Sequence, residues 1–488
     1  MKYGLTLERN SRTELSQQIY QQIKDQILSG ALKPGVRIAS SRLLAESLDV
    51  SRPTINVAFE QLISEGYLES RHGSGTYVQS ALKTTPTKQI KARPGRPVKS
   101  KEHSHFKQEA EKASVKSTSQ TKSSDIVFQF GHPELGHFPH AEWSRLYGRI
   151  TRTATKSDLI SAGGPSGLPQ LRAAVADMVA RMRGMTVDSQ QVIIISGLHQ
   201  GLDLIARLHT TAGSTVIMED PGYPFAASIF KANGANVVYQ PIDREGLTIN
   251  KGRINRSDQS RLFYLTPSHQ FPTGVTMSLP RRLELLDYAK QTDSIILEDD
   301  FDCEYHAHGK PIPSLMSLDK QGCVIYSGTF NQLLFPTIGL GYIIVPKALV
   351  PLYERGRALS GEAVNSQLQK TLAAFIDSGD LERHWKRTRS LYSDRRNTLI
   401  ESLQKHFKGQ HKVQGDHCGI FITVNFDLAL TTGEVVNRAR DNGVIITPTE
   451  HFCTNKQNAS QNQFILGFGT LTESRIKEGI KRLARAVQ

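Results

Sequence analysis

The sequence predicts an α/β protein in which a small module, residues 12–80, is joined by a linker, residues 81–124, to a large domain, residues 125–488. Two short helices around a tight turn, followed by a hairpin pattern, predict the small module. A stretch rich in Lys, Ser, Thr and Pro, with almost no large apolar residues, predicts a disordered linker. Short β-branched strands that alternate with helical stretches predict a mostly parallel, doubly wound sheet in the large domain.

The small module opens with two helical patterns. Apolar residues recur every four positions from Leu15 to Ile27, which predicts an amphipathic helix that ends near Gly30. A second, short helix should follow Ser40 and Ser41, either of which can cap it. The expected inward-facing residues of this second helix are Leu43, Leu44 and Leu48.

A third helix begins at Ser51, and a tight turn at residues 48–50 separates it from the second. Residues 67–71 and 76–78 then form a predicted hairpin around a turn at 72–75, whose glycines allow a positive φ. The expected buried face of the third helix comprises Ile55, Ala58, Phe59 and Leu62. The module is therefore expected to be a helix-turn-helix followed by a hairpin.

The large domain carries seven short strand patterns with helices between several of them, for example 198–208 and 280–290. Ligands of such sheets lie beyond the carboxyl ends of the strands, so a pocket is expected there. The predicted strands are Gln191–Ile195, Thr215–Met218, Asn236–Tyr239, Leu262–Leu265, Ser294–Leu297, Val324–Tyr326 and Tyr342–Val345. Polar and glycine-rich segments follow five of them, at 196–197, 219–223, 266–269, 298–300 and 327–329.

The formal net charge of +14 is concentrated in the linker. Residues 83–124 hold eleven Lys and Arg against three Asp and Glu, whereas residues 1–82 hold nine against eight. Within the linker, the stretch around Arg93 and Arg96 resembles an AT-hook, whose arginines lie in an A·T minor groove. A plain basic tether is an equally good interpretation, and either form would raise DNA affinity in a salt-dependent way.

Cysteine usage and hydropathy favour a cytoplasmic protein. The four cysteines are far apart and include no C-x-x-C pair, so neither a disulfide framework nor a zinc ribbon is expected. The N-terminus lacks the apolar stretch of a signal peptide, and no run is long enough to span a membrane. We therefore expect no membrane partner.

Hydrogen-bond donors gather where a recognition helix would meet DNA. Ser51, Arg52 and Thr54 lie at the start of the third helix, where the helix dipole also favours phosphate. Arg42 precedes them on the second helix and is placed to hold a phosphate, and Arg71 on the hairpin is placed to reach the adjacent backbone or the minor groove. From spacing alone, these are equally well ordinary surface residues of a small helical bundle.

Residues 14–78 resemble the winged helix-turn-helix of the GntR family. The resemblance rests on the blocks PG-R-ASSR-LA, VSR-T and EGYLESRHGSGTYV, which are specific when taken together. It implies binding of double-stranded operator DNA. The positions that it places at the DNA are Ser40, Arg42, Ser51, Arg52, Thr54, Arg71 and Gly73.

Residues 125–488 resemble the fold-type I aminotransferase domain of the MocR-like (GabR-like) regulators. The matching blocks include VIMEDPGYPFA, YLTPSHQFPTGVTMSLPRRLELLDYA, IILEDDFDCEY and YSGTFNQLLFPTIGLGYIIVP. The resemblance implies a homodimer, with a large subdomain at about 160–350 and a small α/β subdomain at about 351–488. It also implies a pocket for pyridoxal phosphate (PLP), held by a Schiff-base lysine, an aspartate at the pyridine nitrogen, a tyrosine and a phosphate-binding arginine.

This sequence matches that pocket only in part. Asp299 stands at the pyridine-partner position, but Phe301 replaces the tyrosine, Gln332 the lysine, and Gly339 the phosphate arginine. The arginine that binds a substrate carboxylate falls on Ile465. An amide nitrogen is not nucleophilic, so no covalent cofactor is expected, and the domain is expected to be a pseudo-aminotransferase without catalytic residues. The residues of the vestigial or repurposed pocket are Ser196, Gly197, Tyr223, His269, Asp299, Phe301, Gln332 and Gly339.

The sequence thus predicts a cytoplasmic, nucleoid-associated DNA-binding transcription regulator whose large domain is expected to dimerise and to sense a small-molecule effector. Three alternatives stay open: a regulator that senses non-covalently bound PLP, a residual PLP-dependent aminotransferase, and a pure dimerisation scaffold. Five acidic and histidine residues alternate at period two along one predicted strand face, but the aminotransferase block already accounts for the acidic ones, so no metal is expected. These five are Asp300, Asp302, Glu304, His306 and His308.

Overall fold

The computed structural model divides the chain into two compact units, residues 1–101 and 102–488. It describes residues 4–11, 13–71, 74–80, 104–112, 122–160, 163–249, 261–306, 313–361, 364–454 and 459–488. Within these ranges, no helix combines the length and the apolar character needed to cross a lipid bilayer.

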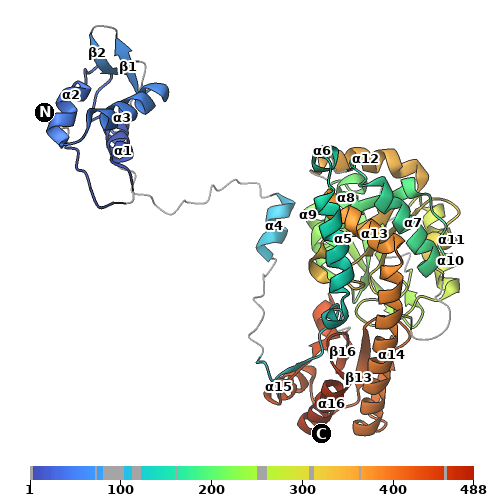
Figure 1. Ribbon diagram of the computed structural model, residues 1–488. Coiled ribbons are helices and arrows are strands. Elements are labelled where there is room, and N and C mark those ends of the chain that lie inside the picture. Colours follow the sequence, from blue (N-terminus) through green and yellow to red (C-terminus); the bar gives the residue numbers. More distant parts are fainter. Residues whose placement is uncertain are drawn as a thin grey trace. The chain divides into compact units, whose positions relative to one another are not determined.

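The first unit contains three helices and a hairpin, as the sequence predicts (Figure 1). Ser40 caps α2 by accepting a hydrogen bond from the Leu43 amide, and Ser51 caps α3 by accepting one from the Thr54 amide. Between the two helices Asp49 adopts a left-handed conformation, with φ of 53°, which makes the tight turn. The elements are α1 (Leu15–Leu28), α2 (Ser41–Leu48), α3 (Arg52–Ser64), β1 (Leu68–Arg71) and β2 (Gly75–Val78).

The core of this unit confirms the predicted buried face of α3 but corrects that of α2. Leu44 is buried, whereas Leu43 is 61% exposed. Leu44 and Leu48 are four residues apart and share one side of the helix, while Leu43 is turned about 100° away from Leu44. Leu43 therefore cannot contribute to the same packed stripe.

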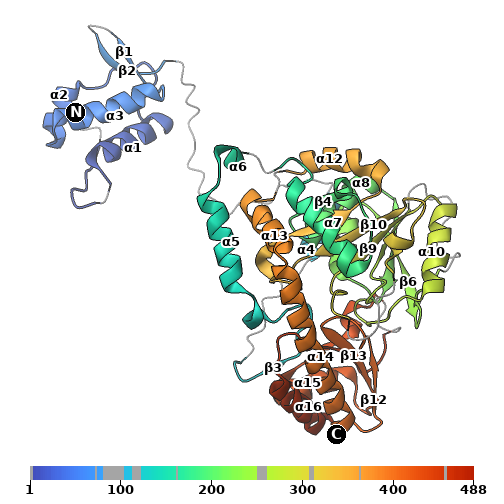
Figure 2. The same cartoon turned by 45° about the vertical axis from the view of Figure 1, so that its right-hand side comes forward.

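The second unit is built on an eight-stranded sheet in the order β4-β11-β10-β9-β8-β5-β6-β7. Four of its strands, β4, β10, β9 and β6, are labelled in Figure 2. Strands β10, β9, β8, β5 and β6 run parallel, β11 is antiparallel to both β10 and β4, and β7 is antiparallel to β6. All seven predicted strands are present. The bounds are β4 (Val192–Ile195), β5 (Thr215–Asp220), β6 (Asn236–Asp243), β7 (Gly246–Leu247), β8 (Arg261–Leu265), β9 (Ile295–Asp300), β10 (Val324–Thr329) and β11 (Gly341–Ile344).

Helices cover both faces of this sheet because successive side chains of each strand point to opposite sides. Ile193 and Ile195 of β4 pack in one core with α8 (Leu198–His209), α9 (Pro224–Ala232) and α12 (Val350–Leu359). Ile194 packs in the opposite core with α7 (Pro169–Arg183) and α13 (Ser366–Asp377). Further along that second face, α10 (Leu279–Gln291) and α11 (Leu315–Leu318) cover β8 and β9. The doubly wound arrangement predicted from the sequence is therefore confirmed.

A smaller layer follows the main sheet. Its four strands have the order β12-β13-β16-β15, and β3 pairs separately with β14. The strands are β3 (Ile126–Val127), β12 (His411–Gln414), β13 (Phe421–Phe426), β14 (Val444–Ile445), β15 (Thr447–Pro448) and β16 (Gln463–Gly467). The helices are α14 (Asp380–His406), α15 (Thr432–Asp441) and α16 (Glu473–Val487). Helix α13 packs on α7 and on α5 (His140–Arg152), so residues beyond 350 still belong to the packing of the main sheet.

A short helix, α4 (His105–Lys112), lies inside the segment for which the sequence predicts no regular structure. Its residues are good helix formers, and Lys112 pairs with Glu109 at 2.6 Å, one turn apart. The helix packs against α9, where a Cβ added at Gly234 would lie 3.4 Å from the His105 ring. Composition alone missed this element because α4 contributes no buried residue of its own.

Candidate functional site

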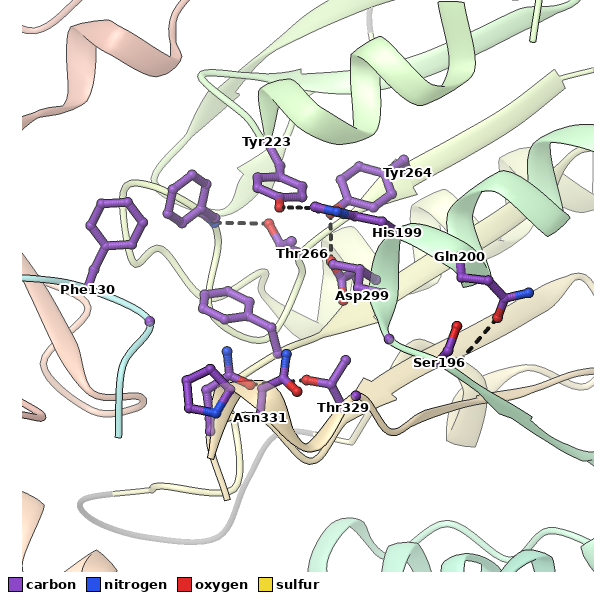
Figure 3. A pocket seen from close by; sticks show the side chains of 18 residues that line it. Phe130, Ser196, His199, Gln200, Tyr223, Tyr264, Thr266, Asp299, Thr329 and Asn331 are labelled. Atoms are coloured by element: carbon purple, nitrogen blue, oxygen red, sulfur yellow. Dashed lines mark hydrogen bonds between the residues drawn. The ribbon is translucent and has the colours of Figure 1, made fainter. Parts of the chain in front are cut away.

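The carboxyl ends of the parallel strands border a cavity of about 420 Å³ (Figure 3). The residues come from the carboxyl ends of β8, β9 and β10, from the loops after these strands and after β4, from the start of α8 and α9, and from the segment after β3. This is the edge of the sheet at which the sequence predicts a pocket. The lining residues are Phe130, Gly131, Ser196, Gly197, Leu198, His199, Gln200, Tyr223, Tyr264, Thr266, Phe271, Asp299, Phe301, Thr329, Asn331, Gln332, Pro336 and Gly339.

Strand β9 sends one of its three consecutive acidic residues into the cavity. Asp299 lines the cavity, while the flanking Glu298 and Asp300 point to the opposite face of the sheet, as alternation along a strand requires. There Asp300 pairs with Arg183 at 2.8 Å and Glu298 with Arg282 at 3.5 Å, and all four side chains are buried. The two arginines offset the charges behind the sheet, so Asp299 alone presents an acidic group to the cavity.

Asp299 is only half satisfied within the described residues. Tyr264 donates its hydroxyl to Oδ2 at 2.6 Å, as the dashed line in Figure 3 shows, and Oδ1 has no hydrogen-bond partner. Burial raises the pKa of Asp299 to about 7, although the Tyr264 hydrogen bond acts in the opposite direction. The carboxyl group therefore has a free acceptor oxygen and changes charge near neutral pH.

Aromatic side chains form much of the cavity wall. The Phe271 ring lies edge-on to Phe301 at 6.1 Å and to Tyr223 at 5.9 Å, measured between ring centroids, and Phe130 approaches Phe271 at 5.4 Å. His199 bonds the Tyr223 hydroxyl at 2.8 Å, and burial lowers the pKa of this histidine. The imidazole is thus neutral at pH 7.

The loop after β10 forms another side of the cavity and carries Gln332. The Gln332 side-chain oxygen accepts a hydrogen bond from the Thr329 hydroxyl at 3.1 Å, and its backbone oxygen accepts one from Tyr305. Gly339 lies further along the same lining, with φ of 59°, and a Cβ at this position would have only the Thr337 carbonyl oxygen nearby, at 3.9 Å. This side of the cavity therefore offers amide groups and open space.

Among the described residues, no lysine or arginine lines the cavity. Ile465, to which the sequence assigns the place of a carboxylate-binding arginine, is buried in a cluster with Phe271 and Phe421. No three His, Cys, Asp or Glu side chains of the described part converge as a metal site. The alternating acidic and histidine residues from Asp300 to His308 do not share one strand face as predicted, because β9 ends at Asp300. His308 lies outside the described residues.

The cavity brings together seven of the eight pocket residues that the sequence singles out. The exception is His269, which is 1% exposed and is absent from the lining. Its Nδ1 bonds Asp302 at 2.8 Å, and its ring stacks on Phe421 at 4.4 Å, behind the wall. Phe130, Tyr264, Thr266 and Phe271 also line the cavity but are not among the predicted pocket residues. Thr266 stands in a predicted strand-end segment, and Tyr264 and Phe271 stand in the same aminotransferase-like block, which was the signal for them, whereas nothing in the local sequence marks Phe130.

In the first unit, the described DNA-contact candidates lie at the starts of α2 and α3, except Arg71, which ends β1. Arg52 donates from Nε to the Ser41 hydroxyl at 3.3 Å, which ties the two helix starts together. Arg42 is largely exposed and pairs with Glu46 one turn along α2. Arg71 pairs with Glu69 and lies over the Tyr77 ring, so a phosphate would have to compete with that carboxylate. Gly73, Arg93 and Arg96 lie outside the described residues.

A polar groove lies beside these candidates, and several of the residues that border it are not among the predicted DNA contacts. Ser40 and Ser41 from α2, Asn56 and Glu60 from α3, and Gly75 and Thr76 from β2 all border it. Arg37 also borders the groove, and a Cβ at Gly75 would meet its guanidinium at 2.9 Å. Arg37 is the isolated arginine of the PG-R-ASSR block, so the resemblance to the GntR family could have marked it as a candidate DNA contact.

Comparison with known proteins gives consistent matches for both units. Residues 15–78 match the gntR family of bacterial regulatory proteins, and residues 145–483 match the class I and II aminotransferases. The chain is 32% identical over 483 residues to the probable rhizopine catabolism regulatory protein MocR of Rhizobium meliloti, covering 99% of this chain and 95% of that protein. It is 28% identical to the pyridoxine biosynthesis regulator PdxR of Corynebacterium glutamicum, covering 99% and 98%.

Among solved structures, a kynurenine aminotransferase of Pyrococcus horikoshii, crystallised with PMP, superposes with a TM-score of 0.68. The two share 28% sequence identity, and the match covers 75% of this chain and 91% of the enzyme. The second unit therefore has the fold-type I aminotransferase architecture that the sequence predicts.

The raised pKa of Asp299 predicts that this residue lowers the free energy of unfolding as the pH rises. In the unfolded chain the group ionises near pH 4, whereas in the folded chain it ionises at about 7, so its contribution to stability falls as the pH rises from about 4 and is fully lost once the pH passes about 7. Asp299→Asn, which can still accept the Tyr264 hydrogen bond, should therefore gain stability relative to wild type between about pH 5 and 8.5. We expect a relative gain of about 1–3 kcal/mol in urea unfolding of the second unit.

The matched control for this experiment is Asp177→Asn on α7. Asp177 is exposed, so the same change in charge should give no comparable gain at the higher pH. A stability difference between wild type and Asp299→Asn that stays constant across this pH range would contradict the assignment of Asp299 as a buried, strained carboxylate.

Proposed function

Since this chain belongs to the MocR-like branch of the GntR transcription regulators, its first unit binds DNA, and we propose that its second unit binds an effector without Schiff-base chemistry. The observation that carries this proposal is the lining of the cavity, which holds Gln332 and no lysine or arginine among the described residues. We place the regulator in the cytoplasm, on the nucleoid.

The proposed absence of PLP chemistry follows from the groups at the cavity. A lysine amine is needed to form a Schiff base, and the Gln332 amide cannot supply one. At the position of the phosphate arginine, Gly339 has no side chain, and the loss of one charge-assisted bond costs about 1.5–3 kcal/mol, or one to two decades in affinity. Asp299 and Tyr223 still suit a flat ring, so the lining fits the ring of PLP but neither its phosphate nor its aldehyde carbon. We therefore propose a pseudo-aminotransferase.

For the DNA-binding unit, we propose that the start of α3 enters the major groove. Arg52 is exposed at the first turn of α3, while Ile55 and Phe59 hold the helix to the core. Thr54 and Ser51 cap this end, where unpaired amides favour phosphate oxygens. We further propose that two chains form a homodimer whose two heads occupy two half-sites.

Helix α9 provides a route by which an effector can influence the linker. Tyr223, at the start of α9, lines the cavity, and α4 of the linker packs against the same helix. A ligand that displaces Tyr223 would shift α9 and hence the surface on which α4 rests. We propose that occupancy of the cavity is transmitted to the DNA-binding heads along this path.

Replacing the recognition arginine should weaken DNA binding without unfolding the unit. Arg52→Ala removes an exposed fork of donors, so we expect a loss of about 1–3 kcal/mol, or roughly 5- to 150-fold, in affinity. Fluorescence anisotropy on a site enriched from random DNA by the wild-type protein would measure it. Lys24→Gln is the matched control, because Lys24 pairs with Glu65 at the opposite end of α3. Equal effects of the two variants would remove α3 from the interface.

Rebuilding the missing groups should restore cofactor attachment. Wild-type protein incubated with PLP and then borohydride should carry no covalent adduct in the cavity, as seen by peptide mass spectrometry. Gln332→Lys combined with Gly339→Arg should gain an adduct at residue 332, although a side chain at the positive φ of residue 339 costs about 1–2 kcal/mol. Each single variant serves as a control. A borohydride-fixed adduct on a wild-type cavity residue would overturn the proposed loss of Schiff-base chemistry.

The basic stretch 91–99 should contribute unspecific attraction to DNA. Exchanging it for a Gly-Ser segment of equal length removes Lys91, Arg93, Arg96 and Lys99. Each lost phosphate contact lowers the slope of log affinity against log salt concentration by about 0.9, so we expect the slope to flatten by about 2–4. An unchanged slope would reduce this stretch to a spacer.

A further inference from the structure

The cavity is electrostatically unusual for a site derived from a phosphate-cofactor pocket. Asp299 is the one acidic residue among its described lining residues, and its lone histidine, His199, is neutral because burial lowers its pKa. The walls therefore carry either no net charge or a single negative one. A phosphate or carboxylate group on a ligand would meet no side-chain cation there, and would face repulsion whenever Asp299 is ionised.

The unpartnered Oδ1 atom of Asp299 can accept a hydrogen bond from a bound ligand. Asp299 is 4% exposed, and its Oδ1 atom has no partner within the described residues, while Tyr264 already occupies Oδ2. Native structures rarely leave a buried carboxylate oxygen without a hydrogen bond. An N–H group presented by a bound molecule would supply it.

The shape of the site indicates a flat ring. The Phe271 ring lies edge-on to both Tyr223 and Phe301 at the cavity wall, and Phe130 lines a further side. Such walls suit an aromatic molecule, and they favour a cationic one because the ring faces are electron-rich. Phe301 has no hydroxyl and Ile465 lies among aromatic rings, so neither provides a polar contact for substituents of the ligand.

We propose that the cavity binds a flat aromatic nitrogen base that donates an N–H to Asp299 and carries no phosphate or carboxylate group. This inference rests on the proposed effector function and specifies its ligand class. Asn331, whose Oδ1 also lacks a partner among the described residues, offers a second acceptor on another side of the cavity.

The strongest argument for an anionic ligand is the start of α8, which also borders the cavity. Gly197 caps this helix without a side-chain hydrogen bond, and the dipole places about half a positive charge at that end. However, the Ser196 amide is already bonded to Gln200 at 3.3 Å. Half a charge, without a side-chain cation, is weaker than the arginine that Gly339 replaces, so we expect it not to reverse the preference.

The test is isothermal titration of the purified full-length protein with matched probes. 4-Aminoquinoline is flat and has a protonated ring nitrogen at neutral pH, and 1-naphthylamine has the same shape with a C–H in place of that nitrogen. Quinoline-4-carboxylate and PLP are the anionic probes. We expect 4-aminoquinoline to bind once per chain and at least about tenfold more tightly than the other three.

Asp299→Asn should weaken 4-aminoquinoline at least about tenfold and leave 1-naphthylamine unchanged, whereas the exposed control Asp177→Asn should alter neither. The melting curve of each variant establishes that it is folded. The proposed ligand class is overturned if an anionic probe binds as tightly as the base, if Asp299→Asn has no effect, or if 4-aminoquinoline gives no binding heat up to about 1 mM. Those outcomes leave DNA binding untouched, because Arg52→Ala tests it independently, and only a borohydride-fixed adduct would also overturn the loss of Schiff-base chemistry.

Discussion

The alternation of side chains along β9 is the constraint on which the cavity depends. Three acidic residues in a row would repel one another in a buried strand, but alternation sends Glu298 and Asp300 behind the sheet, where Arg282 and Arg183 pair with them. Asp299 is left alone on the cavity face with one free oxygen. The ion pairs behind the sheet thus neutralise two of the three carboxylates and leave Asp299 as the acidic group of the cavity. A ligand that fills the cavity should donate a hydrogen bond to its free oxygen.

The aminotransferase fold does not depend on the catalytic groups of the family, because different residues form the cores and the cavity. The sheet is held by apolar cores on both faces, to which α7, α8 and α13 contribute, and none of these cores requires a charge in the cavity. Gln332 and Gly339 line the cavity and do not belong to these cores, so their presence in place of a lysine and an arginine removes no core contact. The proposed loss of Schiff-base chemistry is therefore compatible with a fully packed aminotransferase fold.

The order of elements and most of the cavity could be predicted from the sequence, because strand ends converge whatever the loops contain. His269 could not be placed correctly: its block marks it as a site residue, but the Asp302 hydrogen bond and the Phe421 ring hold it behind the wall. Phe130 could not be found either, since it reaches the cavity from a distant segment. Two local features could not be predicted either. The exposure of Leu43 depends on how α2 is rotated against the core, and the helix α4 depends on its contact with α9.

A ligand can shift a regulator only by the difference between its affinities for two arrangements of the chain. The cavity is suited to create such a difference, because Asp299 lies in β9 of the main sheet and Tyr223 begins α9, which packs on that sheet, whereas Phe130 follows β3 of the smaller layer and packs against Phe452. The Gly222 amide, next to Tyr223, also donates to the Phe452 carbonyl oxygen at 3.1 Å. A ring that fills the space between these aromatic residues would contact both layers at once and so stabilise this arrangement of the two layers. An empty cavity leaves those contacts unmade, and under the proposed effector function α9, which follows Tyr223 and packs against α4, would carry the difference to the linker.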